Sequence, residues 1–396
     1  MSARLEAGRM LSLQAEPRFD LVLVLAVAAL LCIGLVMVAS ASMSLAERSY
    51  GGPLYFFWRQ LGAVSIGLLG GWVMLRTPTT VWERIGPALL VLALVLLLSV
   101  LLPGLGRTVN GSTRWLSVAG MNLIQVSEPA RLLMLLYFAG YAVRRNQELR
   151  SSFAGFARPI GLSIVACAML LLQPDFGAAM MLMVVTLAVL FVAGGRIRDF
   201  ALCAGTVLVL GALAAVAAPY RVVRLTSFLN PWLDPYKTGF QLTNSLIAIG
   251  TGEWSGLGLG GSVQKLFYLP EAHTDFVFAV IAEEFGLLGS VALVALFGVV
   301  VWRVLLVSRQ AALREQWYQA CVAFGFAAWQ GAQVFINIGV NMGILPTKGL
   351  TLPLVSYGRS SLLVTLIGFG LLLRIDMENR GAVGRRRAAA ERRPAA

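Results

Sequence analysis

Long apolar runs, separated by short polar segments, dominate the pattern of residues along the chain. A helix needs roughly 20 apolar residues to cross a hydrocarbon core about 30 Å thick. Ten stretches reach or approach that length, and only Gln173, Pro174 and Asp175 separate the fifth from the sixth. The stretches lie near residues 20–42, 55–75, 85–103, 124–143, 158–173, 175–195, 199–217, 275–303, 317–337 and 357–375.

This pattern predicts an all-α polytopic membrane protein with about ten transmembrane helices and a long loop between helices 7 and 8. The composition agrees, because 58% of the residues are hydrophobic and only 13% are charged. We expect an N-terminal segment at 1–19, a ten-helix domain at 20–375 that includes the long loop at 218–274, and a basic tail at 376–396. The first stretch lacks the cleavage pattern of a signal peptide, so we expect a retained helix.

Arginines mark alternate connections between the stretches, and more of them follow the last stretch. Because cytoplasmic loops of membrane proteins carry the excess positive charge, we expect these connections and both termini in the cytoplasm. The loop at 218–274 and the shorter segments at 104–123 and 338–356 then become extracytoplasmic. The arginines in question are Arg76, Arg84, Arg144, Arg145, Arg150, Arg158, Arg196, Arg198, Arg303, Arg309, Arg314, Arg374, Arg380, Arg385, Arg386, Arg387, Arg392 and Arg393.

The net charge of +13 is spread over short loops beside apolar helices. This distribution favours contact with anionic membrane lipids and argues against a nucleic-acid partner. The three lysines, Lys237, Lys265 and Lys348, fall on the opposite side, together with the only histidine, His273. Lysine binds phosphate as a point charge, so this side is suited to a phosphorylated lipid, although drift in an arginine-rich sequence explains the pattern equally well.

Six glycines lie between Gly250 and Gly261 in the long loop, and Gly256, Gly258 and Gly261 match the pattern GxGxxG. A nucleotide site is not supported, because no strand precedes the match and no acidic ribose partner follows it. The glycines instead indicate positive φ angles and close backbone approach. Irregular backbone at membrane depth must be buried in protein or line a wet cavity, so we expect the loop to fold back into the bundle.

His273 and Asp275 belong to the string LPEAHTDF, where the long loop runs into an apolar helix. A carboxylate at a membrane boundary is costly and is usually functional, but Asp275 or Thr274 is equally suited to cap the helix N-terminus. Metal-ligand clusters, GxSxG and GxxxxGK[ST] are absent from the sequence. Acid–base chemistry by a protein side chain is therefore the simplest remaining mechanism.

A second polar string, GVNMGILPTKGLTLPLVSYGRSS, joins the last two apolar stretches. Its glycines and prolines prevent a continuous helix. Polar side chains in such a segment mark a cavity or a substrate path, and Lys348, Ser356 and Ser360 are among the candidates.

Together these strings resemble the SEDS family (shape, elongation, division and sporulation), over residues 20–375. The other shared motifs are VNGSTRWL, QVSEPARL, QPDFG and FLNPWLDP. Ala272 in PEAHTD and Arg359 in SYGRSS resemble the division-type FtsW branch more than the RodA branch.

The resemblance implies a glycosyltransferase of the bacterial inner membrane, located at the division septum. It would polymerise lipid II, the undecaprenyl-pyrophosphate-linked disaccharide-peptide, outside the cytoplasm beside a class B penicillin-binding protein and other division proteins. It also implies that Asp275 is catalytic. An inverting transfer needs a base for the acceptor hydroxyl and cations for the leaving pyrophosphate. Arg114, Lys348 and Lys265 are candidate cations, and Asn110, His273, Ser356 and Ser360 are further substrate-binding candidates.

No cofactor is required by the sequence, although a divalent cation, Mg²⁺ or Mn²⁺, is compatible with pyrophosphate chemistry. Two other functions stay open: a lipid II flippase, since broken helices and buried charges are transporter features, and a scaffold that recruits a penicillin-binding protein.

Five other charged residues have structural or cavity-lining interpretations. Glu128 and Arg131 are three residues apart on one helix and can pair. Asp175 either shapes the cavity or ends a turn behind Pro174. Of Glu283 and its neighbour Glu284, one can line a cavity and the other can pair with Arg59 or Arg131, and the sequence leaves this open.

Overall fold

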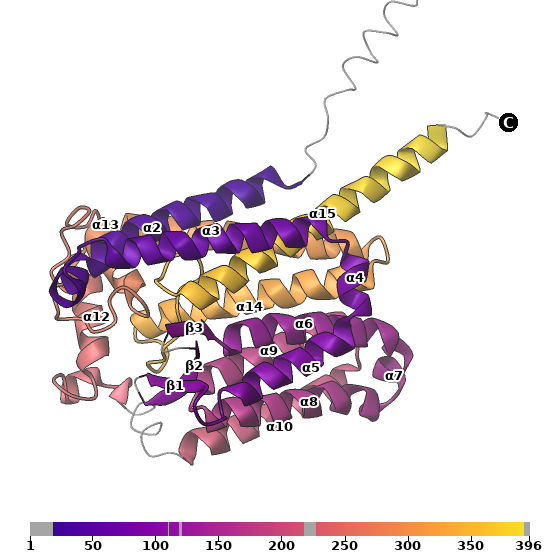
Figure 1. Cartoon of the computed structure of the whole chain (residues 1–396), viewed down its shortest axis with the longest axis horizontal. Helices are drawn as coiled ribbons and strands as arrows, with labels where there is room; N and C mark the ends of the chain where they lie inside the picture. Colours follow the sequence, from indigo (N-terminus) through magenta and orange to yellow (C-terminus); the bar gives the residue numbers. More distant parts are fainter. Residues whose placement is uncertain (1–18, 110, 119–120, 218–226, 392–396) are drawn as a thin grey trace, which may run out of the picture.

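Long helices running roughly side by side make up most of the computed structural model, which describes residues 19–109, 111–118, 121–217 and 227–391 (Figure 1). The helices are α2 (Leu21–Tyr50), α3 (Tyr55–Arg76), α4 (Thr79–Arg84), α5 (Gly86–Ser99), α6 (Ser127–Arg144), α7 (Asn146–Ser151), α8 (Phe153–Leu172), α9 (Phe176–Val192), α10 (Ile197–Val216), η1 (Pro231–Leu233), α12 (Phe240–Thr251), α13 (Val277–Ala312), α14 (Trp317–Asn341) and α15 (Arg359–Glu391).

Each of the ten predicted apolar stretches overlaps one of these helices, so the predicted polytopic helical fold is confirmed. By length and composition, five helices among the described residues can cross a membrane: α2, α8, α13, α14 and the Arg359–Gly381 part of α15. The apolar helices α5 and α9 are shorter. The chain is a multi-pass membrane protein.

The connections between helices gather at two ends of the bundle. The end that we call the loop end carries the segments 104–125, 227–276 and 342–358, and the opposite end carries α4 and α7 (Figure 1). The arginine-rich connections lie at the opposite end, whereas Lys265, Lys348 and His273 lie at the loop end. The predicted alternation of arginine-rich connections with connections that lack this excess is therefore present in the fold.

A small antiparallel sheet occupies the segment that the sequence analysis treated only as a loop. Strands β1 (Gly106–Val109), β2 (Ser112–Val118) and β3 (Met121–Gln125) pair in the order β1-β2-β3. Gly111, at φ 76°, lies in the turn between β1 and β2, where a hairpin requires left-handed backbone. Because β3 extends to Gln125, the fourth membrane helix begins at Ser127 rather than near residue 124. Asn110 lies outside the described residues.

The glycine-rich loop folds back into the bundle, as predicted, and it packs there against a break in α13. Gly286 interrupts this helix with φ 64° and ψ −161°, a conformation essentially restricted to glycine. The amides of Leu257 and Gly258 donate to the carbonyls of Glu283 and Glu284, at 3.0 and 2.9 Å. Beyond the break, the amide of Leu287 donates to the carbonyl of Glu253 at 2.8 Å. The loop thus satisfies backbone groups that the broken helix leaves unpaired.

Close packing of α3 against α15 depends on small residues. A Cβ atom on Gly370 would lie 2.1 Å from the carbonyl oxygen of Gly71, so only glycine permits this approach. Such small-residue contacts are the usual way in which membrane helices pack.

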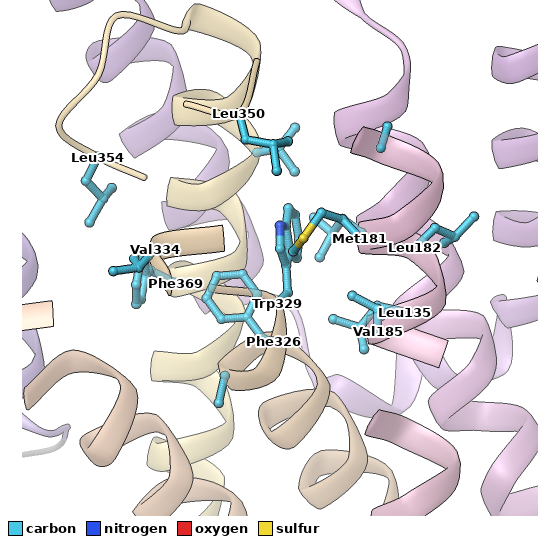
Figure 2. Packing of buried hydrophobic residues seen from close by; sticks show 14 of the residues in the cluster. Leu135, Met181, Leu182, Val185, Phe326, Trp329, Val334, Leu350, Leu354 and Phe369 are labelled. Atoms are coloured by element: carbon cyan, nitrogen blue, oxygen red, sulfur yellow. The ribbon is translucent and has the colours of Figure 1, made fainter. Parts of the chain in front are cut away.

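The core lies where α6, α9, α14 and α15 meet. Figure 2 shows Met181, Leu135 and Trp329 in this core, with Leu350 on the connection between α14 and α15 above them. The connection at 342–358 is therefore anchored in the core as well as exposed at the loop end.

The break at Gly286 leads to a stability prediction. Gly286→Ala should lower the thermal stability of the purified protein, because a Cβ atom would lie 2.5 Å from the amide nitrogen of Gly256 and because the backbone conformation itself costs about 1–3 kcal/mol for other residues. The matched control is Gly298→Ala on the same helix, where a Cβ atom meets nothing within 4 Å. Equal melting temperatures for the two variants would contradict the proposed role of the break.

Candidate active site

Asp275 lies at the loop end, two residues before α13 begins, and its side chain is half-buried. Two asparagines of α14 hold its backbone. The side-chain amides of Asn337 and Asn341 donate to the carbonyl oxygen of Asp275, at 2.9 and 3.0 Å. The oxygen of the Asn341 amide also accepts from the amide of Ala279 at 3.2 Å. The position of the Asp275 backbone is therefore fixed by α14.

The same face of α14 also holds the connection at 342–358. Gln333, Asn337 and Asn341 follow one another at intervals of four residues, which places them on one helix face. Gln333 donates to the carbonyl of Thr351 at 2.9 Å, and Asn337 donates to the carbonyl of Leu350 at 2.6 Å. We call these three side chains the amide row. The amide row joins the Asp275 segment to the connection that carries Lys348.

The backbone at Gly349 runs directly against the carboxylate of Asp275. A Cβ atom on Gly349 would lie 3.0 Å from Oδ2 of Asp275, which is closer than nearly all real contacts of this kind. Glycine at this position therefore leaves room for the carboxylate beside the connection.

Lys348 immediately precedes this contact and lies in the loop outside the membrane-spanning helices. Its Nζ lies 3.3 Å from Sδ of Met180 and 4.5 Å from the centre of the Phe176 ring, both on α9. Burial among these apolar groups lowers the pKa of the Lys348 ammonium to about 8. Within the described residues Lys348 forms no ion pair, so its charge is available to an anionic ligand.

His273 forms part of an aromatic wall beside Asp275. Its ring lies 4.9 Å from that of Phe56 and 5.6 Å from that of Tyr357, measured between centres. Its backbone carbonyl accepts from the amide of Tyr357 at 2.9 Å. Burial lowers the pKa of His273, while the nearby carboxylate of Glu271 acts in the opposite direction. A neutral imidazole at pH 7 is better suited to shaping the site than to binding phosphate as a cation.

Arg114 and Asp175 lie together at the edge of the same region. Nη1 of Arg114, on β2, is 3.8 Å from Oδ2 of Asp175. Asp175 also caps α9, since its side chain accepts from the amide of Ala178 at 3.1 Å. Arg114 remains partly exposed, so it combines a loose structural ion pair with access to the site.

Ser356 and Ser360, predicted to bind substrate, both make internal hydrogen bonds. The hydroxyl oxygen of Ser356 accepts from the amide of Leu352, and that of Ser360 accepts from the amide of Gln125 on β3, each at 2.9 Å. Both side chains are buried. These bonds fix the connection at 342–358 and attach the sheet to the start of α15.

Lys265 is held in a buried ion pair. Its Nζ lies 2.6 Å from Oε1 of Glu284 and 2.9 Å from the hydroxyl of Ser40 on α2. Glu283 accepts from the hydroxyl of Ser262 and from the amide of Val263. The suggestion that one of these glutamates pairs with Arg59 or Arg131 is wrong, because the long loop folds over both carboxylates and, together with Ser40 of α2, supplies their donors.

The predicted pairing of Glu128 with Arg131 is present, at 3.5 Å. Arg131 also lies over the ring of Trp329, 4.9 Å from its centre, and donates to Gln333 at 3.4 Å. Glu128 and Arg131 thus lie directly behind the amide row, where they support Gln333.

Two features of this site escaped the sequence analysis. The amide row was not recognised, although three amide side chains at intervals of four residues in an apolar helix are a detectable signal. Gln60 was also missed: its side chain donates to the carbonyl of Ser356 at 3.0 Å and accepts from the amide of Gly358 at 3.4 Å. No sequence pattern indicates that contact, which joins α3 to a segment almost 300 residues away.

Residues 21–381 match the family model described as cell cycle protein, which covers FtsW, RodA and SpoVE. The chain belongs to this family. The resemblance to the SEDS family, inferred from the motifs, is therefore confirmed.

Among similar family members is the probable peptidoglycan glycosyltransferase FtsW of Thioalkalivibrio sulfidiphilus, 53% identical over 96% of this chain and 94% of the relative. The protein of the same name from Coxiella burnetii is 48% identical over 91% of this chain and 96% of the relative. These names agree with the predicted division-type branch.

Two solved structures share the fold. One chain comes from work on the coordination of polymerization and crosslinking by a peptidoglycan synthase complex. It is 31% identical, has a TM-score of 0.74, and the match covers 91% of this chain and 98% of that one. The rod shape determining protein RodA of Thermus thermophilus is 28% identical, with a TM-score of 0.67 and coverage of 93% and 99%.

The amide row leads to a prediction about local stability. Asn341→Ala should speed amide hydrogen exchange at residues 275–281, because it removes one donor to the carbonyl of Asp275 and one of the two acceptors of the Ala279 amide. Each hydrogen bond of this kind contributes about 0.5–1.5 kcal/mol. Asn244→Ala is the matched control, since Asn244 donates only to Phe240 within its own helix. Equal exchange in the two variants would show that Asn341 does not hold this segment.

Proposed function

We propose that this chain is a peptidoglycan glycosyltransferase that polymerises lipid II, with Asp275 as the general base. The observation that carries the proposal is the position of Asp275: Asn337 and Asn341 hold its backbone carbonyl, and its carboxylate lies against Gly349, the residue that follows Lys348. A carboxylate and a neighbouring cation are the two groups that this reaction requires. The names of the similar family members support the same activity.

The proposed reaction joins the sugar of one lipid-linked molecule to that of another. The acceptor hydroxyl oxygen attacks the anomeric carbon of the donor sugar, and the bond from that carbon to the pyrophosphate oxygen breaks. The electron pair leaves with the pyrophosphate, and the hydroxyl proton passes to Asp275. For this transfer the carboxylate must come within about 2.6–3.2 Å of the hydroxyl, or act through one water.

Lys348 is the proposed counter-charge for the leaving pyrophosphate, with Arg114 as a second cation at the edge of the site. Both lie at the loop end near α9: Lys348 contacts Met180 of this helix, and Arg114 pairs with Asp175, which caps it. Lys265 is less suited to this role because its ammonium is already paired with Glu284 in a buried position. We propose that Lys265 positions the long loop.

We also propose that a divalent cation, Mg²⁺ or Mn²⁺, takes part in the reaction. Oxygen ligands of carboxylate and pyrophosphate suit such ions, and Asp275 is a carboxylate in the site. The ion would supply further positive charge against the leaving group. Chelation with EDTA followed by addition of Mg²⁺ or Mn²⁺ tests this: recovery of polymer only with added metal supports the proposal, and full activity in EDTA contradicts it.

We also propose that the loop end faces the outside of the cell, that both termini are cytoplasmic and that the protein acts at the division septum. The arginine-rich connections at the opposite end support this orientation. A class B penicillin-binding protein is the proposed partner. Its support is the similarity to a chain of a peptidoglycan synthase complex.

Asp275→Asn should abolish glycan polymer formation from purified lipid II, because an amide has nearly the same shape but cannot accept the proton as a base. The assay is gel electrophoresis of the products, with and without the penicillin-binding protein. The control is Glu271→Gln, an exposed carboxylate four residues away. Polymer formation by Asp275→Asn would exclude this base. Lipid II translocation without polymer would favour a flippase, and partner binding without either activity would favour a scaffold.

Lys348 leads to a pH prediction. The pKa of its ammonium lies at about 8, and kcat/KM reports the ionisation of the free enzyme. The value of kcat/KM should therefore fall as the pH rises through this range, when Lys348 loses its charge. Lys348→Arg keeps the charge to much higher pH, so any activity that it retains should lack this alkaline decline. The same decline in both proteins would exclude Lys348 as its source.

A further inference from the structure

A second cationic site lies at the loop end, apart from Lys348. A cavity of about 230 Å³ opens between the outer parts of α3 and α15, beside β3. It contains two arginines, while most of its other lining is apolar or small. The lining residues are Arg59, Gly62, Ala63, Ile66, Ile124, Arg359, Ser360 and Leu363. We call this cavity the α3/α15 groove.

The two arginines come from different helices and converge on one small space. Arg59 is oriented by Tyr55, because its guanidinium donates to the Tyr55 hydroxyl and lies 5.2 Å from the centre of that ring. Arg359 is the first residue of α15. A guanidinium offers several donors in a plane and matches the geometry of phosphate oxygens. The groove therefore combines a site for phosphate groups with an apolar surface for a hydrocarbon chain.

The aromatic wall of Phe56, His273 and Tyr357 adjoins both places along the chain, because Tyr357 lies two residues before Arg359 and His273 lies two residues before Asp275. The ring of Phe56, on α3, lies 5.0 Å from that of Tyr357 and 4.9 Å from that of His273. Both Arg59 and Arg359 lower the pKa of the Tyr357 hydroxyl, against the stronger effect of burial, which raises it. The charges of the two guanidinium groups thus both act on the hydroxyl of Tyr357. Lys348 instead faces Met180 and Phe176 of α9.

The polymerisation proposed above joins two molecules, and each of them carries a pyrophosphate on a prenyl chain. Two such anions need two separate sets of cations. We propose that the α3/α15 groove binds the pyrophosphate and the first prenyl units of one of these two lipids, while the other uses Lys348. This inference rests on the proposed function. Two arginines suit the two phosphates of a pyrophosphate, and the small volume suits a single chain better than the two acyl chains of a phospholipid.

Gly62 provides a direct way to test the groove. Gly62 lines the groove, and a Cβ atom on it would meet nothing within 4 Å, so we expect a larger side chain at this position to occupy part of the groove. A helical glycine also gains stability from replacement, because leucine has the higher helix propensity. Gly62→Leu should therefore fold normally and fill the site. Gly161→Leu on α8, which also has nothing within 4 Å, is the matched control.

The experiment measures binding of undecaprenyl pyrophosphate to the full chain in phosphatidylcholine nanodiscs, by native mass spectrometry. Two bound molecules are expected for the unmodified protein and for Gly161→Leu. One is expected for Gly62→Leu and for the double variant Arg59→Gln, Arg359→Gln. In the polymerisation assay, Gly62→Leu should raise the KM for lipid II by about tenfold or more, which corresponds to a loss of about 1.4 kcal/mol of binding.

Unchanged binding in both groove variants would overturn the inference. So would displacement of the probe from the groove by an equal concentration of phosphatidylglycerol, because the groove would then be a general site for anionic phospholipids. The proposed function fails separately, if Asp275→Asn still forms polymer. The binding experiment does not depend on catalysis, so the two failures can be distinguished.

Discussion

In the apolar interior of this bundle, every backbone N–H and C=O group outside a regular helix must form a hydrogen bond with another part of the protein. This constraint determines how the segments of the site are held together. The amide row of Gln333, Asn337 and Asn341 donates these hydrogen bonds to the backbone carbonyls of Asp275, Leu350 and Thr351. The glycine-rich loop forms the hydrogen bonds that the backbone around the break at Gly286 requires. In both places the bonds that satisfy irregular backbone also join distant segments, and together they bring the Asp275 segment and the Lys348 connection to one location.

Charged side chains have two different roles in this structure: most form pairs that hold elements together, and Lys348 does not. Near the opposite end, Arg303 of α13 binds Asp20 at the start of α2, and the backbone amide of Asp20 donates to Asp376 of α15. Lys265 and Glu284 form a similarly buried pair at the loop end. These pairs hold helices and loops together. Lys348 differs from them, because its neighbours on α9 are a thioether and an aromatic ring, which leaves its charge for a ligand.

The sequence was sufficient to predict the ten apolar helices, the return of the glycine-rich loop and the location of Asp275, because each depends on local composition or on a long motif. The sheet at residues 106–125 was missed, since its strands are short and its apolar positions also suit the edge of a membrane helix. The roles of Ser356, Ser360 and Glu284 could not be predicted either. Their partners, Leu352, Gln125 and Lys265, are chosen by tertiary packing, and polar residue types alone do not distinguish internal hydrogen bonds from substrate contacts.

In the proposed reaction, Asp275 contacts the acceptor hydroxyl and Lys348 contacts the leaving pyrophosphate. A structure of the Asp275→Asn chain with lipid II bound, determined by cryo-electron microscopy, measures this directly. We expect an acceptor hydroxyl within about 2.6–3.2 Å of the residue 275 side chain, with a pyrophosphate against Nζ of Lys348. Lipid II bound with its sugars and pyrophosphate away from both residues would exclude these roles.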